Sequence, residues 1–318
     1  MEANEILDRI QTLKIPKEDD EYSLFRLEEK NIYYGIDKNN HISFLVESQT
    51  PNVHTIVQET KCLNFGFNIK AKIITNGYKT EKKFHILTCT SNLLNDIKAF
   101  VSLTEAFKNN IKEDNPFIMN ELFSSLRNLF DDTSIRTDME LQGFFAELYI
   151  IYYFMQKDIN ILEYWQKKEK MKFDFSISEQ KKMEVKSTLK EIRIHRFRHE
   201  QLLSELYDII IGSLLLREND MGLSLYELIL RVKDNAENNY KTLLYIENFV
   251  KNISEEKLKE KKYDEIYIKN NMKFYRADMV PRFNEKTPEG VSKAEYDSDL
   301  SNVNSLLEDD VIKWLQEK

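Results

Sequence analysis

Residues 172–189 read KFDFSISEQKKMEVKSTL, two short runs in which apolar and polar residues alternate. Alternation with a period of two is typical of a strand whose two faces meet different surroundings. The pattern therefore predicts strands over about 172–177 and 182–189, joined by a polar turn. The first strand is expected to carry Asp174 on one face. Its other face is expected to carry the apolar side chains Phe173, Phe175 and Ile177.

The second strand combines core and polar positions. Met183 and Val185 are expected to face the core, which leaves Glu184 and Lys186 together on the opposite face. Pairing of the two strands would bring Asp174 close to both polar side chains. The segment therefore predicts a cluster of two carboxylates and one ammonium group.

The tripeptide Glu-x-Lys is common in this chain and proves nothing by itself. It begins at seven positions, Glu28, Glu59, Glu81, Glu179, Glu184, Glu255 and Glu260. Only the copy at Glu184 has an apolar middle residue, Val185, as a half-buried strand requires. A solvated hairpin with a surface Glu–Lys pair is the alternative for this segment.

Two carboxylates on one face repel each other, so one should take up a proton unless a cation lies between them. A hard divalent ion removes this conflict, and the lack of a His or Cys cluster favours Mg²⁺ or Mn²⁺ over zinc. Held by Asp174 and Glu184, the ion could activate water and stabilise charge on a phosphate oxygen. Lys186 could orient or deprotonate the water, or offset charge in the transition state. The cluster thus predicts hydrolysis of a phosphodiester.

A second unusual position is Glu147, the single charged residue in the apolar run 144–155. The run belongs to a helix predicted over about 139–156. Burial of an unpaired carboxylate is costly, so a cation or a strong donor is expected beside it, and the metal or Lys186 would supply one. A carboxylate that reaches solvent at the helix edge, or one held in a structural salt bridge, is the alternative.

The order of the predicted elements indicates a mixed α/β fold in three domains. The domains are a β-rich unit at 1–110, a nuclease core at 111–220 and an α+β part at 221–318. In the last of these, Ser224 and Glu227 form a potential capping box, and a hairpin is expected over 267–274. Two helices followed by a hairpin could form a winged-helix DNA reader, or a lid or support for the core. A further helix is expected at about 199–206.

Charge and composition limit the possible partners. The net charge of −8 argues mildly against a protein coated by nucleic acid, but residues 181–198 hold seven Lys or Arg and only two acids. Arg193, Arg196 and Arg198 are therefore candidate DNA contacts, with a solvated loop as the alternative. The start of the chain has no secretory pattern and no apolar run could span a bilayer. We expect a cytoplasmic protein without membrane contact, with reduced cysteines.

These motifs also carry a family resemblance. They are Gly143-Phe-Phe-Ala-Glu147-Leu, Trp165, Phe173-Asp174-Phe, Glu184-Val-Lys186-Ser and Gln201-Leu. In them the chain resembles, over essentially its whole length, the bacterial PD-(D/E)XK motif proteins, first defined as a domain of unknown function. The resemblance implies a restriction-endonuclease-like fold. It also implies association with DNA methyltransferases and ATPases in restriction or phage-defence loci.

The resemblance assigns a role to each candidate residue. Asp174 and Glu184 would be metal ligands and Lys186 the catalytic lysine, with Glu147 as the helix carboxylate. Gln201 would be a helix-borne active-site residue. The expected activity is divalent-metal-dependent cleavage of DNA, and a homodimer would supply the two sites that double-strand cutting usually needs. The alternatives are a scaffold or specificity subunit that does not cut alone, and a nuclease directed at RNA.

Overall fold

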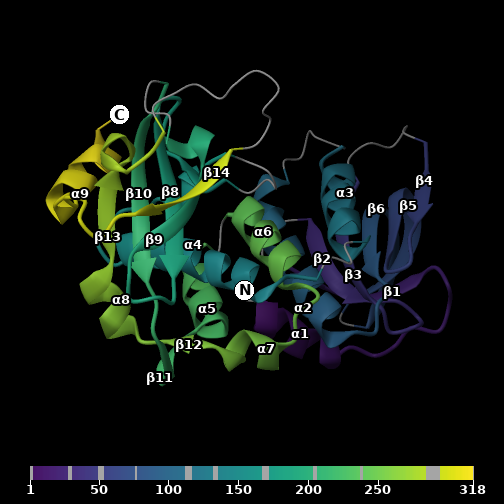
Figure 1. The fold of residues 1–318 in the computed structure, drawn as a ribbon. Helices are drawn as coiled ribbons and strands as arrows, with labels where there is room; N and C mark the ends of the chain where they lie inside the picture. Colours follow the sequence, from purple (N-terminus) through teal and green to yellow (C-terminus); the bar gives the residue numbers. More distant parts are fainter. Residues whose placement is uncertain are drawn as a thin grey trace. The chain divides into compact units, whose positions relative to one another are not determined.

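The structure is a computed structural model that forms two compact units (Figure 1). Unit 1 consists of Met1–Ser134 and Glu237–Asn252, and unit 2 of Ile135–Ala236 and Ile253–Lys318. The structure describes residues 3–27, 31–48, 54–75, 77–111, 117–131, 135–166, 172–202, 206–236, 239–283 and 294–317. The domain boundaries expected near 110 and 220 fall inside these units, and the three-domain division stays a prediction.

Unit 1 is built on a six-stranded sheet in the order β1-β2-β3-β6-β5-β4. The strands are β1 (Glu21–Arg26), β2 (Ile32–Ile36), β3 (Ile42–Glu47), β4 (Ile56–Glu59), β5 (Leu63–Thr75) and β6 (Tyr78–Cys89). Because β1 also pairs in parallel with β5, five of these strands close on themselves. The helices of the unit are α1 (Ala3–Gln11), α2 (Leu94–Phe107), η1 (Lys108–Asn110), α3 (Ile118–Asp131) and α6 (Tyr240–Val250).

Unit 2 is built on a mixed sheet in the order β13-β10-β8-β7. The strands are β7 (Phe175–Ser176), β8 (Lys181–Thr188), β10 (Asp208–Leu215) and β13 (Lys273–Arg276). The central pair, β8 and β10, is parallel, and the two outer strands run antiparallel to their neighbours. A separate two-stranded ribbon is formed by β9 (Ile194–Arg198) and β14 (Glu295–Asp299).

The remaining elements of unit 2 are mostly helical. They are α4 (Asp138–Met155), η2 (Leu162–Tyr164), η3 (His199–Leu202), β11 (Glu218–Ser224), α5 (Leu225–Asn235), α7 (Glu255–Glu260), β12 (Lys262–Tyr263), α8 (Glu265–Asn271), η4 (Ala277–Met279) and α9 (Glu308–Gln316). The capping box predicted from Ser224 and Glu227 is present at the start of α5. None of the helices within the described ranges has both the length and the apolar character needed to cross a bilayer.

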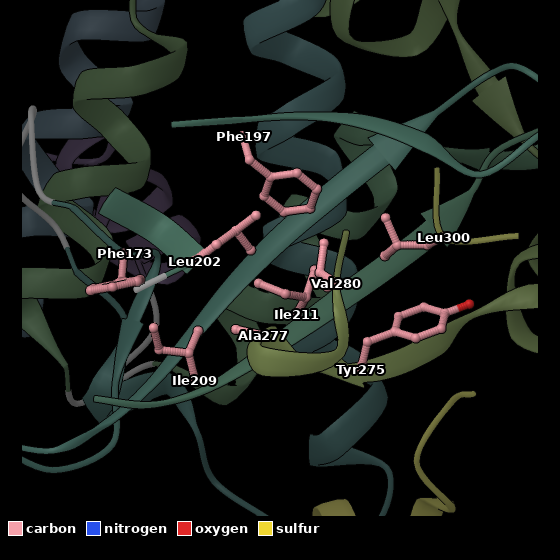
Figure 2. Packing of buried hydrophobic residues seen from close by; sticks show 9 residues of the cluster. All are labelled: Phe173, Phe197, Leu202, Ile209, Ile211, Tyr275, Ala277, Val280 and Leu300. Atoms are coloured by element: carbon pink, nitrogen blue, oxygen red, sulfur yellow. The ribbon is translucent and has the colours of Figure 1, made fainter. Parts of the chain in front are cut away.

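The two faces of the unit 2 sheet are covered by different elements. On one face Ile150 of α4 packs against Gly212 of β10, as suits a helix that is apolar on nearly all sides. On the other face lies a cluster of buried side chains, drawn in Figure 2. Its members are Phe173, Phe197, Leu202, Ile209, Ile211, Tyr275, Ala277, Val280 and Leu300. Because Glu184 is in register with Ile211, the two residues share this second face.

The first predicted strand is shorter than expected. Only Phe175 and Ser176 form β7, and Phe175 pairs with Met183, which lies on the α4 face. Phe173 instead joins the cluster on the opposite face, so the prediction that Phe173 and Phe175 share one face is wrong. The physical reason is that the chain leaves the sheet at Asp174, where strict alternation ends.

The predicted hairpin over 267–274 is also wrong, because α8 occupies most of it. Asp264 caps this helix by accepting a hydrogen bond from the backbone N–H of Tyr267. The helix continues to Asn271, whose side chain donates to the Tyr267 carbonyl, and β13 begins at Lys273. The wing of the winged-helix alternative is therefore replaced by a helix and a single strand. The helix expected from His199 is in turn the short η3, and residues 203–205 lie outside the described part.

Candidate active site

The predicted site residues meet at the edge of β8 where β7 stops. The last pair between the two strands is Phe175 with Met183. The next β8 amide on that edge, the Val185 N–H, donates to Oδ2 of Asp174 at 2.7 Å. A side-chain carboxylate thus takes the place of a strand carbonyl, and Asp174 is fixed beside Glu184 as the sequence predicted.

Glu184 is the most enclosed member of the site, with 3% of its surface exposed. Its Oε1 accepts hydrogen bonds from Lys186 Nζ and from Gln201 Nε2, both at 2.6 Å. Its Oε2 is buried, and the described residues offer it no hydrogen-bond partner. Buried carboxylate oxygens are normally satisfied, so this oxygen is available to a cation or to another donor.

Gln201 links the members of the site. Besides donating to Glu184, it accepts from the backbone N–H of Arg198 at 3.0 Å and from Lys186 Nζ at 3.4 Å. Its Nε2 also donates to the carbonyl of Lys172 at 3.3 Å. The amide comes from η3, the described part of the helix predicted at about 199–206. The structure brings it to the site, between the carboxylate and the ammonium group.

Glu147 of α4 is half-buried, and its partner differs from the expected one. The indole N–H of Trp165 donates to Glu147 Oε2 at 2.7 Å. A strong donor therefore lies beside this carboxylate as expected, but it is the indole of Trp165, whereas the sequence analysis names the metal or Lys186. Glu147 still belongs to the cluster electrostatically, because its charge raises the pKa of Asp174, and Glu184 raises that of Glu147.

The surroundings of the site disfavour the charged forms of its three carboxyl groups. Burial raises the pKa of Glu147 to about 7, and its hydrogen bond from Trp165 offsets this only in part. Burial, followed by the charges of Glu184 and Glu147, raises the pKa of Asp174 well above its ordinary value. Burial also raises the pKa of Glu184 despite the nearby Lys186. Three carboxyl groups therefore share one ammonium group, a clear deficit of positive charge.

Lys186 is the cation of the cluster and is about one-fifth exposed, at 21% of its side chain. Burial by itself would lower its pKa, but Glu184 and Asp174 raise the pKa above the ordinary value. Its ammonium group also lies 5.5 Å from the ring centre of Phe197 on β9. The lysine is thus held in one place by a carboxylate, an amide and an aromatic ring.

These residues fit a hard divalent cation. The unpartnered Glu184 Oε2 and the Asp174 carboxylate are oxygen donors, and a cation would relieve the repulsion that raises their pKa values. Within the described ranges no three His, Cys, Asp or Glu residues are arranged to hold a metal by themselves. An ion here would keep water in most of its coordination shell, as Mg²⁺ usually does.

The three predicted DNA contacts divide into two kinds. Arg193 is buried, and its guanidinium donates to the Ser213 carbonyl at 2.9 Å, to the Ser213 hydroxyl at 2.7 Å and to the Asn271 carbonyl. Arg196 and Arg198 are exposed and form ion pairs across the ribbon with Asp297 and Glu295, which lie on β14. Arg193 is therefore occupied inside the protein, whereas the other two face solvent.

Comparison with known proteins gives one family. A family model with the description "Putative PD-(D/E)XK family member (DUF4420)" matches residues 9–301. No curated protein and no solved structure matches the chain. The matched range includes every residue of the site described above.

Proposed function

The chain belongs to this PD-(D/E)XK-type family, and from that premise we propose that it is a divalent-metal-dependent endonuclease that hydrolyses DNA phosphodiesters. We further propose that unit 2 carries a restriction-endonuclease-like core. The observation that carries the proposal is the buried Glu184 Oε2, for which the described residues provide no hydrogen-bond partner, while its neighbours Asp174 and Lys186 are fixed around it. Carboxylates and a lysine in this arrangement suit a site that binds a cation and a phosphate together.

The residues of the site would have separate roles. Asp174 and Glu184 would hold the cation, which when bound supplies activated water and offsets charge on the phosphate. Lys186 would donate to the attacking water or to a phosphate oxygen. Gln201 would keep Lys186 and Glu184 at a fixed separation, because it bonds to both and is itself held by the Arg198 backbone.

The test is cleavage of supercoiled plasmid with Mg²⁺ or Mn²⁺, blocked by EDTA. Lys186→Ala should lower the rate by at least about 10²-fold, a typical loss for one transition-state donor, without loss of DNA binding or of folding. Lys190→Ala is the matched control, since Lys190 lies in the same basic stretch but is exposed at the end of β8. Wild-type activity in Lys186→Ala would overturn the assignment.

Binding of the ion can be tested apart from cleavage. Glu184→Gln should abolish Mn²⁺ binding measured by calorimetry, because it removes the charge of the site carboxylate whose Oε2 has no hydrogen-bond partner among the described residues. Parallel digestion of plasmid and total RNA decides between a DNA and an RNA substrate. A protein that binds Mn²⁺ through Glu184 but cuts neither would instead be a scaffold or specificity subunit.

We also propose DNA contacts and partners. Arg196 and Arg198 would contact phosphates once DNA competes with Asp297 and Glu295, since exposed ion pairs are weak. On the strength of the family resemblance, we propose that such a nuclease acts in restriction or phage defence beside a DNA methyltransferase or an ATPase. Double-strand cutting by a homodimer would appear as a second-order dependence of linear product on protein concentration.

A further inference from the structure

Trp165 is bonded to the segment that carries Asp174, just before β7. It is 2% exposed and forms a β-bridge with Phe175, on the edge of β7 that faces away from β8. The next residue, Gln166, donates its backbone N–H to the Asp174 carbonyl at 2.8 Å. The main chain of Asp174 is therefore held by residues 165–166 while its side chain is held by Val185.

The same tryptophan reaches the helix that carries Glu147. Its indole N–H donates to Glu147 Oε2 at 2.7 Å, and its ring packs against Phe144 one turn earlier, with ring centres 5.8 Å apart. Within the described part of the chain, Trp165 is the hydrogen-bond donor to this carboxylate. One short segment thus fixes two carboxylates of the site, Asp174 through its backbone and Glu147 through its side chain.

We propose that Trp165 is a positioning residue that sets the Glu147 carboxylate in place relative to Asp174 and Glu184. The proposal rests on the proposed nuclease function and adds a residue to it. An indole N–H can only donate, and a hydrogen bond to a carboxylate is stronger than one between neutral groups. Since Glu147 and Glu184 repel each other, a fixed donor on Oε2 of Glu147 holds the carboxylate in one orientation against that repulsion.

The chain contains a matched control for this bond. Its other tryptophan, Trp314 on α9, also donates its indole N–H to a carboxylate at 2.7 Å, in this case Oδ2 of Asp208. Trp314 is buried to a similar degree, with 7% exposed, and belongs to the same unit. Asp208 stands at the start of β10 and takes no part in the site. The two tryptophans therefore make the same kind of hydrogen bond, one to a carboxylate of the site and the other to a carboxylate outside it.

The first experiment compares Trp165→Phe with Trp314→Phe, each of which keeps an aromatic ring and removes one donor. Trp165→Phe should lower kcat by about 10- to 100-fold with little change in KM, as is usual when the partner of an active-site group is removed. Trp314→Phe should leave kcat unchanged. The double variant Trp165→Phe/Glu147→Gln should be no slower than Glu147→Gln alone. Wild-type kcat in Trp165→Phe, or additive losses in the double variant, would overturn the proposal.

The second experiment does not depend on cleavage. In Trp314→Phe protein the single indole N–H resonance reports on Trp165, and Glu147→Ala should shift it by removing the acceptor. Mg²⁺ should shift the same resonance when Glu147 is present, and markedly less in Glu147→Ala. If both shifts are seen but the protein cuts no nucleic acid, Trp165 positions Glu147 and the proposed nuclease activity is wrong. A resonance that Glu147→Ala leaves unmoved would reject the positioning role, even in an active nuclease.

Discussion

The two edges of β8 differ sharply. Towards β10 the strand is paired at every residue from Lys181 to Thr188, whereas towards β7 only two residue pairs form. The edge towards β10, here called the complete edge, adjoins apolar side chains such as Ile211. The edge towards β7, the interrupted edge, lies beside the carboxylates. Within one strand, one edge is therefore built for stability and the other collects groups that repel one another.

A reactive site can be accommodated where the pairing of a strand is interrupted. A ladder that is complete on both sides leaves no room for side chains at its edge. Here the departure of the chain at Asp174 frees one amide of β8, and the carboxylate of the same residue satisfies it. The site thus uses a gap in the sheet without leaving a backbone donor unpaired.

The largest effect on stability should come from the complete edge. Ile211→Ala, at a position that is fully buried in the cluster of Figure 2, should lower the free energy of unfolding by about 2–5 kcal/mol. Glu184→Gln, at the register position beside it, should change this free energy much less, because the hydrogen bond from Lys186 is weakened but the repulsion between the carboxylates is weakened as well. Urea unfolding in EDTA measures both. An equal loss in the two variants would remove the distinction between the edges.

A smaller effect is expected where Asp174 completes the ladder. Asp174→Ala leaves the Val185 N–H without its acceptor and should lower the free energy of unfolding by about 1–3 kcal/mol. Asp174→Asn keeps an oxygen acceptor and should lower it by less. Hydrogen exchange of the Val185 amide should accelerate in the alanine variant. Equal exchange rates in the two variants would show that the side chain does not substitute for a strand.

The repulsion itself should appear as a dependence of stability on pH. A carboxyl group whose pKa is raised on folding binds its proton more tightly in the folded protein. Its contribution to stability is therefore greatest below its ordinary pKa and is lost as pH rises. For Glu147 this loss spans pH 4.5 to about 7, with a slope of at most about 1.4 kcal/mol per pH unit.

His195 contributes the opposite slope, because burial lowers its pKa to about 3 and its stabilising effect is lost as pH falls from 6.5. The difference between wild type and Glu147→Gln isolates the carboxyl group. In EDTA, the free energy of unfolding of the variant should rise relative to that of the wild type as the pH increases from 5 to 7. Saturating Mg²⁺ should reduce this relative rise, since a bound cation favours the charged form. A constant difference across this range would contradict the raised pKa.

The smallest effect is expected on the β9–β14 ribbon. Arg196→Gln breaks an exposed ion pair with Asp297 and should leave the free energy of unfolding almost unchanged, because water screens the pair. If the ribbon contacts DNA, the same variant should lower the salt dependence of binding by about one phosphate contact. Fluorescence anisotropy at several salt concentrations measures this slope. An unchanged slope would take Arg196 out of the interface.

The centre of the site could be predicted from the sequence because it is local. Glu184 and Lys186 are two residues apart on one strand, and alternation alone places them together. Asp174 lies on the adjoining segment, within reach of the same turn. The bond between Trp165 and Glu147 joins a helix to a loop 18 residues later, and no periodicity encodes it.

The burial of Arg193 could have been predicted from the spacing of the residues around it. Arg193, His195 and Phe197 occupy every second position, and all three are buried. Treated as a strand, the stretch would have placed Arg193 on the inner face, whereas counting basic residues placed it on the surface. The partner strand β14 begins 97 positions after Arg198 (295 − 198), so its pairing lay beyond any local pattern.

The return of the chain to unit 1 has a consequence for protein synthesis. Helix α6 packs against α2 and α3, and Tyr240 contacts Phe107 with ring centres 4.8 Å apart. This helix leaves the ribosome only after the first half of unit 2 has been made. Until α6 has been synthesised, the apolar surface of α2 and α3 that it contacts stays exposed. A fragment that ends at residue 134 would expose this surface permanently. Removal of residues 237–252 should accordingly destabilise the fold of unit 1, although about a hundred residues separate them from its first part.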